Sequence, residues 1–181
     1  MTPRTYPGML DNSTEYFAKK KNVYLLKNGT VRLFEEEKNH PELEELLKVE
    51  PMLAETLASM CGGNHRQMLK KLAMCRFGAL NFEADFSNGA VTHDYCDCPL
   101  RGKCKGENIV CKPLVINGET VTPEELSILR KCVTNTKNWV IALSLDLPLG
   151  TFNVMKTAVY KRLNIQTKQQ SAITLFEKGL L

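Results

Sequence analysis

Four cysteines stand close together in a short segment that also contains glycine and proline. Cys96, Cys98, Cys104 and Cys111 give the pattern C-x-C-x5-C-x6-C within residues 96–111. Four soft thiolate ligands in one loop suit a tetrahedral metal site, with His93 as an alternative ligand. We predict zinc as the cofactor; an iron–sulfur cluster, or free or reversibly oxidised thiols with no metal, are the alternatives.

The other three of the seven cysteines have a simpler interpretation. Cys61, Cys75 and Cys132 fall on apolar faces of predicted helices, where a thiol behaves as a small hydrophobic group. The first residues lack the apolar core of a signal peptide, and no apolar run reaches the length of a membrane span. We therefore expect a cytoplasmic protein that contacts no membrane, in which a disulfide framework would not persist.

The residues before the cysteine loop predict a mixed α/β region. Residues 1–20 read as a loose arm with a short helix near Glu15–Lys20, and Asn28-Gly29 supplies the type I′ turn of a β-hairpin. His40 and His65 lie near predicted helix starts and should be solvated. The expected elements are strands 23–26 and 31–34, helices 41–48, 52–60 and 65–77, and strand pairing within 82–95. A doubly wound receiver domain needs strands and helices in regular alternation, and this pattern is absent. We therefore expect no receiver domain and no control by a phosphorelay.

The last part of the chain predicts four helices. Thr122 can cap the first, with Pro123 in its first turn and Glu125 as capping-box partner. The helices are expected at 123–133, 139–145, 151–164 and 168–177, with a turn at 146–150. The predicted fold is thus mainly α with small β: a mixed α/β domain at 1–116 that includes the four-cysteine loop, followed by a four-helix domain at 117–181.

The third of these helices has two different faces. Its core stripe should be Phe152, Met155, Val159 and Leu163, because these positions share one side at helical spacing. The opposite face is small and polar, and an α-helix fits the major groove of B-DNA, where such side chains can meet base edges or phosphates. An ordinary amphipathic helix is the alternative. The predicted DNA contacts are Thr151, Asn153, Val154, Lys156, Thr157, Lys161 and Arg162.

Residues 118–181 also contain a series of motifs: Val121-Thr122, Glu125, Ile128-Leu129, Asn138, Ile141-Ala142, Leu145, Thr151-Phe152, Tyr160 to Ile165 and Thr167. With these motifs the segment resembles the DNA-binding domain of LuxR-type transcription regulators. The resemblance implies a helix-turn-helix domain whose third helix is the recognition helix and whose fourth mediates dimerisation.

This sequence departs from the family pattern at several positions. Asn153 and Met155 replace a lysine and a histidine, which weakens phosphate attraction. Asp146 replaces a glycine before the turn and must tolerate a left-handed backbone. Lys137 replaces a capping serine, so we expect Asn135 or Thr136 to take the cap. Trp139 stands where a polar, exposed residue is usual; we expect it to be partly buried, with a partner contact as the alternative.

Two functions follow from these patterns. The first is a transcription regulator that binds double-stranded DNA as a homodimer and carries a metal- or thiol-containing N-terminal module. The second is a protein-interaction module whose degenerate helix-turn-helix no longer binds DNA, which a net charge of only +4 permits. No nucleotide-phosphate loop, paired His/carboxylate motif or nucleophile elbow is visible, so we predict no enzyme activity.

Overall fold

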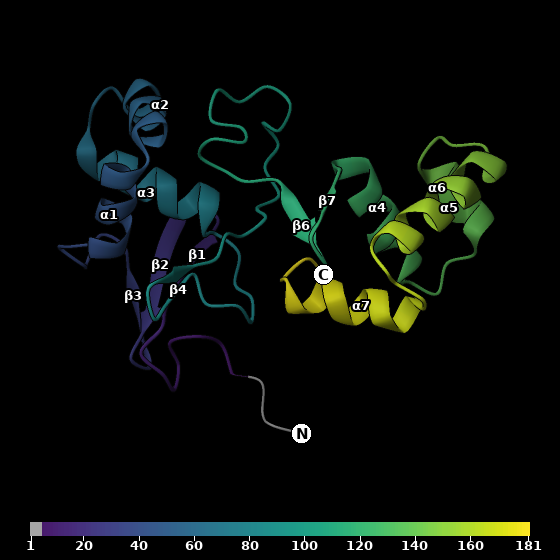
Figure 1. The fold of residues 1–181 in the computed structure, drawn as a ribbon, viewed down its shortest axis with the longest axis horizontal. Helices are drawn as coiled ribbons and strands as arrows, with labels where there is room; N and C mark the ends of the chain where they lie inside the picture. Colours follow the sequence, from purple (N-terminus) through teal and green to yellow (C-terminus); the bar gives the residue numbers. More distant parts are fainter. Residues whose placement is uncertain (1–4) are drawn as a thin grey trace. The chain divides into compact units, whose positions relative to one another are not determined.

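The computed structural model describes residues 5–181, and the chain divides into two compact units. The first unit ends at Lys112 and the second runs from Pro113 to Leu181 (Figure 1). The boundary expected from the sequence, between residues 116 and 117, would separate two strands that pair with each other. Among the described residues, no helix is both long and apolar enough to cross a membrane.

The first unit contains an antiparallel sheet in the order β3-β2-β1-β4-β5. Its strands are β1 (Thr14–Lys19), β2 (Asn22–Lys27), β3 (Thr30–Leu33), β4 (Phe86–Ser87) and β5 (Ala90–Val91). The β2–β3 hairpin is confirmed, since Asn28 and Gly29 both have the positive φ that a type I′ turn requires. The strand expected from Phe82 is wrong over most of its length, because pairing begins only at Phe86.

The short helix expected near Glu15–Lys20 is wrong, because Glu15 to Lys19 belong to strand β1 and Lys20 lies in the turn after it. The strand pairs with β2 along its whole length, from Thr14 opposite Lys27 to Lys19 opposite Asn22. Glu15 and Tyr16 are both fully buried, so tertiary packing overrides the helical tendency of the segment. Residues 1–4 of the expected loose arm lie outside the described residues.

Three helices complete the first unit: α1 (Pro41–Val49), α2 (Pro51–Cys61) and α3 (His65–Arg76). Helix α3 packs against β1 and β2 (Figure 1). Its Leu72 and Ala73 are fully buried in the core. His65 is exposed as expected and lies 2.8 Å from Glu44. His40 is a correction: it is buried between the Tyr16 hydroxyl and the Phe34 carbonyl oxygen, and burial lowers its pKa.

The second unit begins with a hairpin and continues with helices. The hairpin is β6 (Leu114–Ile116) and β7 (Glu119–Val121), and the helices are α4 (Pro123–Cys132), α5 (Asn138–Ser144), α6 (Leu149–Arg162) and α7 (Lys168–Glu177). The predicted capping box of α4 is present in both directions between Thr122 and Glu125. Asn117 ties the hairpin to α6, because its side-chain amide donates to the Leu163 carbonyl oxygen at 2.7 Å.

Candidate nucleic-acid interface

The turn between α5 and α6 has a defined hydrogen-bond pattern. Asp146 has a φ of 53°, and its N–H donates to the Leu143 carbonyl while the Leu147 N–H donates to that of Ala142. These two bonds form a Schellman motif, in which the residue after the C-cap is left-handed. Asp146 therefore adopts the backbone conformation that its place in the turn demands.

A small apolar core fixes α4, α5 and α6 against one another. Its fully or nearly fully buried members are Ile128, Cys132, Ile141, Ala142 and Phe152. The expectation that Asn135 or Thr136 caps α5 is wrong: Lys137 occupies the N-cap position and its side chain accepts no capping hydrogen bond. The start of α5 thus depends on tertiary packing rather than on a cap.

Helix α6 buries the stripe that the sequence predicted. Phe152, Val159 and Leu163 are at most 2% exposed, whereas Met155 is half-buried and packs on the core from its side. The helix begins at Leu149 and ends at Arg162, two residues earlier at each end than the expected 151–164. Pro148 precedes it with an extended backbone, which sets where the helix starts.

The opposite face of α6 is exposed over its whole length. Thr151, Asn153, Thr157 and Lys161 are exposed, and Val154 is 70% exposed. The side chains on this face are short and uncharged except for Lys161 at the far end, so the helix backbone can come close to another surface.

Asn138 contacts the exposed face of α6, a role that the sequence did not predict. Its side-chain amide donates to the Asn153 side-chain oxygen at 3.4 Å, across fifteen positions of the chain. The contact orients Asn153, which stays exposed, while Asn138 is half-buried. Spacing within one helix could not have found it, because it joins α5 to α6.

The two cations on the flanks of this face differ from Lys161. The Lys156 ammonium lies 5.6 Å from the centre of the Tyr160 ring and is half-buried. Arg162 donates to Glu125 at 2.5 Å and to the Thr120 carbonyl oxygen, and it lies 3.7 Å from Glu119. The hydrogen bond to Glu125 raises the pKa of Arg162. Arg162 thus holds α6 to α4 and β7, and its contact with phosphate stays a prediction.

Positive charge is concentrated in the second unit. Residues 113–181 hold eight lysines and arginines against five acidic residues, which is most of the chain's net charge of +4. A modest excess of this kind attracts phosphate without the strongly basic footprint of many DNA-binding domains.

Helix α5 carries an exposed apolar surface. Trp139, expected to be partly buried, is 56% exposed, and Leu143 is 70% exposed. The two residues are four apart and therefore share one side of the helix. This pair gives α5 an exposed apolar surface.

The predicted metal ligands lie in a loop without regular structure. Cys96, Cys98, Cys104 and Cys111 are all half-buried free thiols. Within residues 5–181, no group of three or more His, Cys, Asp or Glu side chains is arranged closely enough to hold a metal ion. The four thiols are therefore not arranged as a finished metal site, and their role as zinc ligands stays a prediction.

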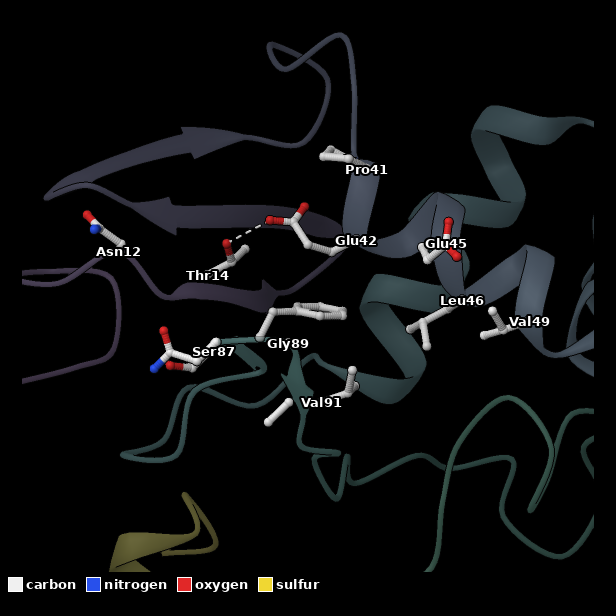
Figure 2. Close-up of a pocket in the computed structure, with 13 residues that line it drawn as sticks. Asn12, Thr14, Pro41, Glu42, Glu45, Leu46, Val49, Ser87, Gly89 and Val91 are labelled. Carbon is white, nitrogen blue, oxygen red and sulfur yellow. Dashed lines mark hydrogen bonds between the residues drawn. The ribbon is translucent and has the colours of Figure 1, made fainter.

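The first unit also has an open pocket of about 530 Å³ beside β4 and β5. Figure 2 shows Glu42 reaching Thr14 at its edge, with a hydrogen bond of 3.0 Å, and Leu46 and Val49 on its helical side. Glu42 also binds Lys27 at 2.6 Å. Because the Glu42 carboxylate is already bound to Thr14 and Lys27, the pocket gives no indication of a ligand.

Comparison with known families agrees with the geometry of the second unit. Residues 119–175 match the model of the family described as bacterial regulatory proteins, luxR family. The predicted LuxR-type helix-turn-helix domain is thereby confirmed for this segment, and the match supports a DNA-binding transcription regulator. No curated protein and no solved structure matches the chain.

Proposed function

We propose that the protein regulates transcription by inserting α6 into the major groove of double-stranded DNA. The observation that carries this proposal is the exposed polar face of α6 inside a segment that matches the luxR family. Asn153 can pair with adenine, Val154 can contact a thymine methyl group, and Thr157 can bond to a base edge or a phosphate. Thr151, Lys156 and Lys161 are assigned to the phosphate backbone.

Binding as a homodimer is part of the proposal. Ile173 and Phe176 on α7 are 53% and 49% exposed, and their spacing of three residues places them on one side of the helix. A second copy of α7 could cover this apolar surface, as in a two-fold symmetric complex on a two-fold symmetric site. Sedimentation of the wild type and of an Ile173→Asp variant tests this: the variant should be monomeric at concentrations where the wild type is a dimer.

Selection of bound duplexes from a random library, followed by fluorescence anisotropy, tests DNA binding. Replacing Asn153 with alanine should cost about 1–3 kcal/mol on the selected site and relax the preference at one base pair. Replacing Lys161 should weaken binding to all sequences and reduce the slope of log K against log salt by about 1.

Lys38→Ala is the matched control, because it removes one exposed lysine from the first unit. It should leave both the affinity and the salt slope unchanged. If the Asn153, Thr157 and Lys161 triple alanine variant binds the selected duplex as tightly as the wild type, α6 is not the recognition helix.

The exposed pair Trp139 and Leu143 favours a second candidate function, a protein-interaction module that does not bind DNA. Under this alternative no duplex is selected at low salt, and a protein partner covers α5. Trp139 is the only tryptophan of the chain, so its emission reports on this surface directly. A blue shift with a protein partner, in a chain without DNA affinity, would favour the alternative over the first proposal.

A further inference from the structure

One thiol on α3 lies within electrostatic range of the cysteines of the loop. Cys75 is half-buried in the last turn of the helix; burial raises the pKa of its thiol to about 11, and negative charge on Cys98, Cys104 or Cys111 would raise it further. The nearest of these in sequence is more than twenty residues away, so the fold, not the chain, brings them near Cys75. The sequence alone had placed Cys75 with the ordinary buried cysteines.

Arg76, the residue after Cys75, fixes the loop to the end of α3. Its side chain is fully buried and donates to the carbonyl oxygens of Val110, at 2.8 Å, and Ile109. Cys111 directly follows these two residues. The two bonds to the loop therefore hold the segment that contains Cys111 against the end of α3 that contains Cys75, and the two bonds to Glu50 fix the guanidinium itself.

Gly106 brings two of the other thiols together. Its N–H donates to the Cys104 sulfur at 3.4 Å, and the Cys111 thiol contacts its carbonyl oxygen at 3.9 Å. A side chain at this position would collide with Val110 and Met60, whose atoms lie 2.9 and 3.0 Å from where it would begin. The glycine thus lets the loop fold tightly enough for both sulfurs to contact the backbone of one residue.

Cys96 is oriented differently from the other loop cysteines. Its sulfur lies 3.2 Å from the position where a side chain on Gly78 would begin, and it accepts a hydrogen bond from the Gly78 N–H. Burial, and next the charge of Asp94, raise the pKa of the Cys96 thiol to about 12. A metal-bound thiolate beside the buried Asp94 carboxylate would be electrostatically unfavourable, so Cys96 is poorly placed as a ligand.

We propose that Cys75, Cys98, Cys104 and Cys111 form a four-thiolate metal centre, with Cys96 outside it. The centre would hold a thiophilic metal, either one Zn²⁺ or an iron–sulfur cluster. Binding of Zn²⁺ would replace the thiol protons, which leave to solvent, with metal–sulfur bonds of about 2.3 Å. Lys71, whose charge already acts on Cys75, would offset part of the negative charge.

Metal binding then completes the local fold instead of filling a finished site. The thiols are near one another but not at ligand distances, and the loop that carries three of them has no regular secondary structure to resist a small closure. Coupling between metal binding and local folding is common in small loop-rich segments. This inference concerns the first unit and does not depend on DNA binding by the second.

Metal content of the full chain, purified without oxygen, tests the proposal. The wild type should contain about one zinc per chain, or iron with acid-labile sulfide and a brown colour, and this distinguishes the two forms of the centre. The Cys75→Ser variant should lose most of the metal. The Cys96→Ser and Cys132→Ser variants should keep it.

Differential alkylation of the unaltered protein provides a second measurement, independent of whether Cys75→Ser folds. Removing the metal with a chelator should accelerate alkylation at Cys75, Cys98, Cys104 and Cys111 and leave Cys96 and Cys132 unchanged. Full metal content in Cys75→Ser, loss of metal in Cys96→Ser, or no metal in the wild type would each overturn the proposal.

Discussion

Replacement of Arg76 by methionine should destabilise the first unit strongly. The guanidinium is 0% exposed and binds both Glu50 oxygens, at 2.6 and 3.2 Å, as well as the carbonyl oxygens of Val110 and Ile109. Methionine fills much of the same volume but can donate to none of these four acceptors. The loop that carries Cys111 would lose its attachment to α3.

The expected loss is about 3–4 kcal/mol. The Val110 carbonyl belongs to a residue that is 1% exposed, and leaving such a group without a donor costs about 1–3 kcal/mol. Breaking a buried ion pair costs about 3–5 kcal/mol when the remaining charge stays buried. The Glu50 side chain is 33% exposed and can be rehydrated, which places the expected value toward the lower end of that range.

Urea unfolding followed by two probes measures this loss. Far-UV circular dichroism reports on both units, whereas fluorescence of Trp139, the only tryptophan, reports on the second. With an m-value of about 1–3 kcal/mol/M, the midpoint of the first unit should fall by at least about 1 M. The Trp139 transition should keep its midpoint.

Glu50→Gln is the matched variant, since it removes the charge but retains an acceptor for the guanidinium. It should cost clearly less than Arg76→Met, at about 1–2 kcal/mol. If Arg76→Met lowers the unfolding free energy of the first unit by less than about 1 kcal/mol, the argument that Arg76 anchors the loop is refuted.

Three further predictions concern single positions. Burial, with Asp94 nearby, raises the pKa of Glu15 from 4.5 to about 9, so the stability that protonated Glu15 contributes at low pH is lost as the pH rises toward 9. Glu15→Gln should remove up to about 1.4 kcal/mol per pH unit of this decline, as measured by denaturation curves between pH 5 and 9. An unchanged dependence of the unfolding free energy on pH would contradict this prediction. Thr122→Ala should destabilise the second unit by about 1 kcal/mol through loss of the α4 capping box, measured by Trp139 fluorescence, with an unmoved midpoint as the contrary result. Asp146→Ala should be less stable than Asp146→Gly by about 1 kcal/mol in the same assay, because alanine is strained at a φ of 53°; equal stability would argue against a left-handed turn.

Local signals in the sequence were sufficient for much of the second unit. The capping box at Thr122 and the buried stripe of α6 each follow from the chemistry of a few neighbouring residues. The left-handed Asp146 followed from the resemblance to the LuxR-type pattern, which has glycine at this position. The pair Asn117-Gly118 carries the same type I′ signal as Asn28-Gly29, and both of its residues have positive φ. The hairpin β6–β7 could have been predicted from it and was not.

Features that depend on contacts between distant residues could not be predicted in this way. Strand β1 contains Glu15, whose burial is possible only because the N–H groups of Asn81 and Asp85 donate to its carboxyl oxygens. Arg162 lies on the predicted DNA-binding flank but is bound to Glu125, and Cys75 lies near thiols from another segment. Periodicity within one element contains no information on such partners.

The left-handed turn at Asp146 also constrains how this domain can change during evolution. Only glycine, asparagine and aspartate tolerate this backbone readily, and the turn sets the geometry between α5 and α6. Aspartate can change to either of the other two by a single-nucleotide substitution, so all three are accessible without passing through a strained residue. Sequences descended from a common ancestor should therefore alternate among these three residues here, while the exposed positions of α6 diverge freely with the surface that they contact.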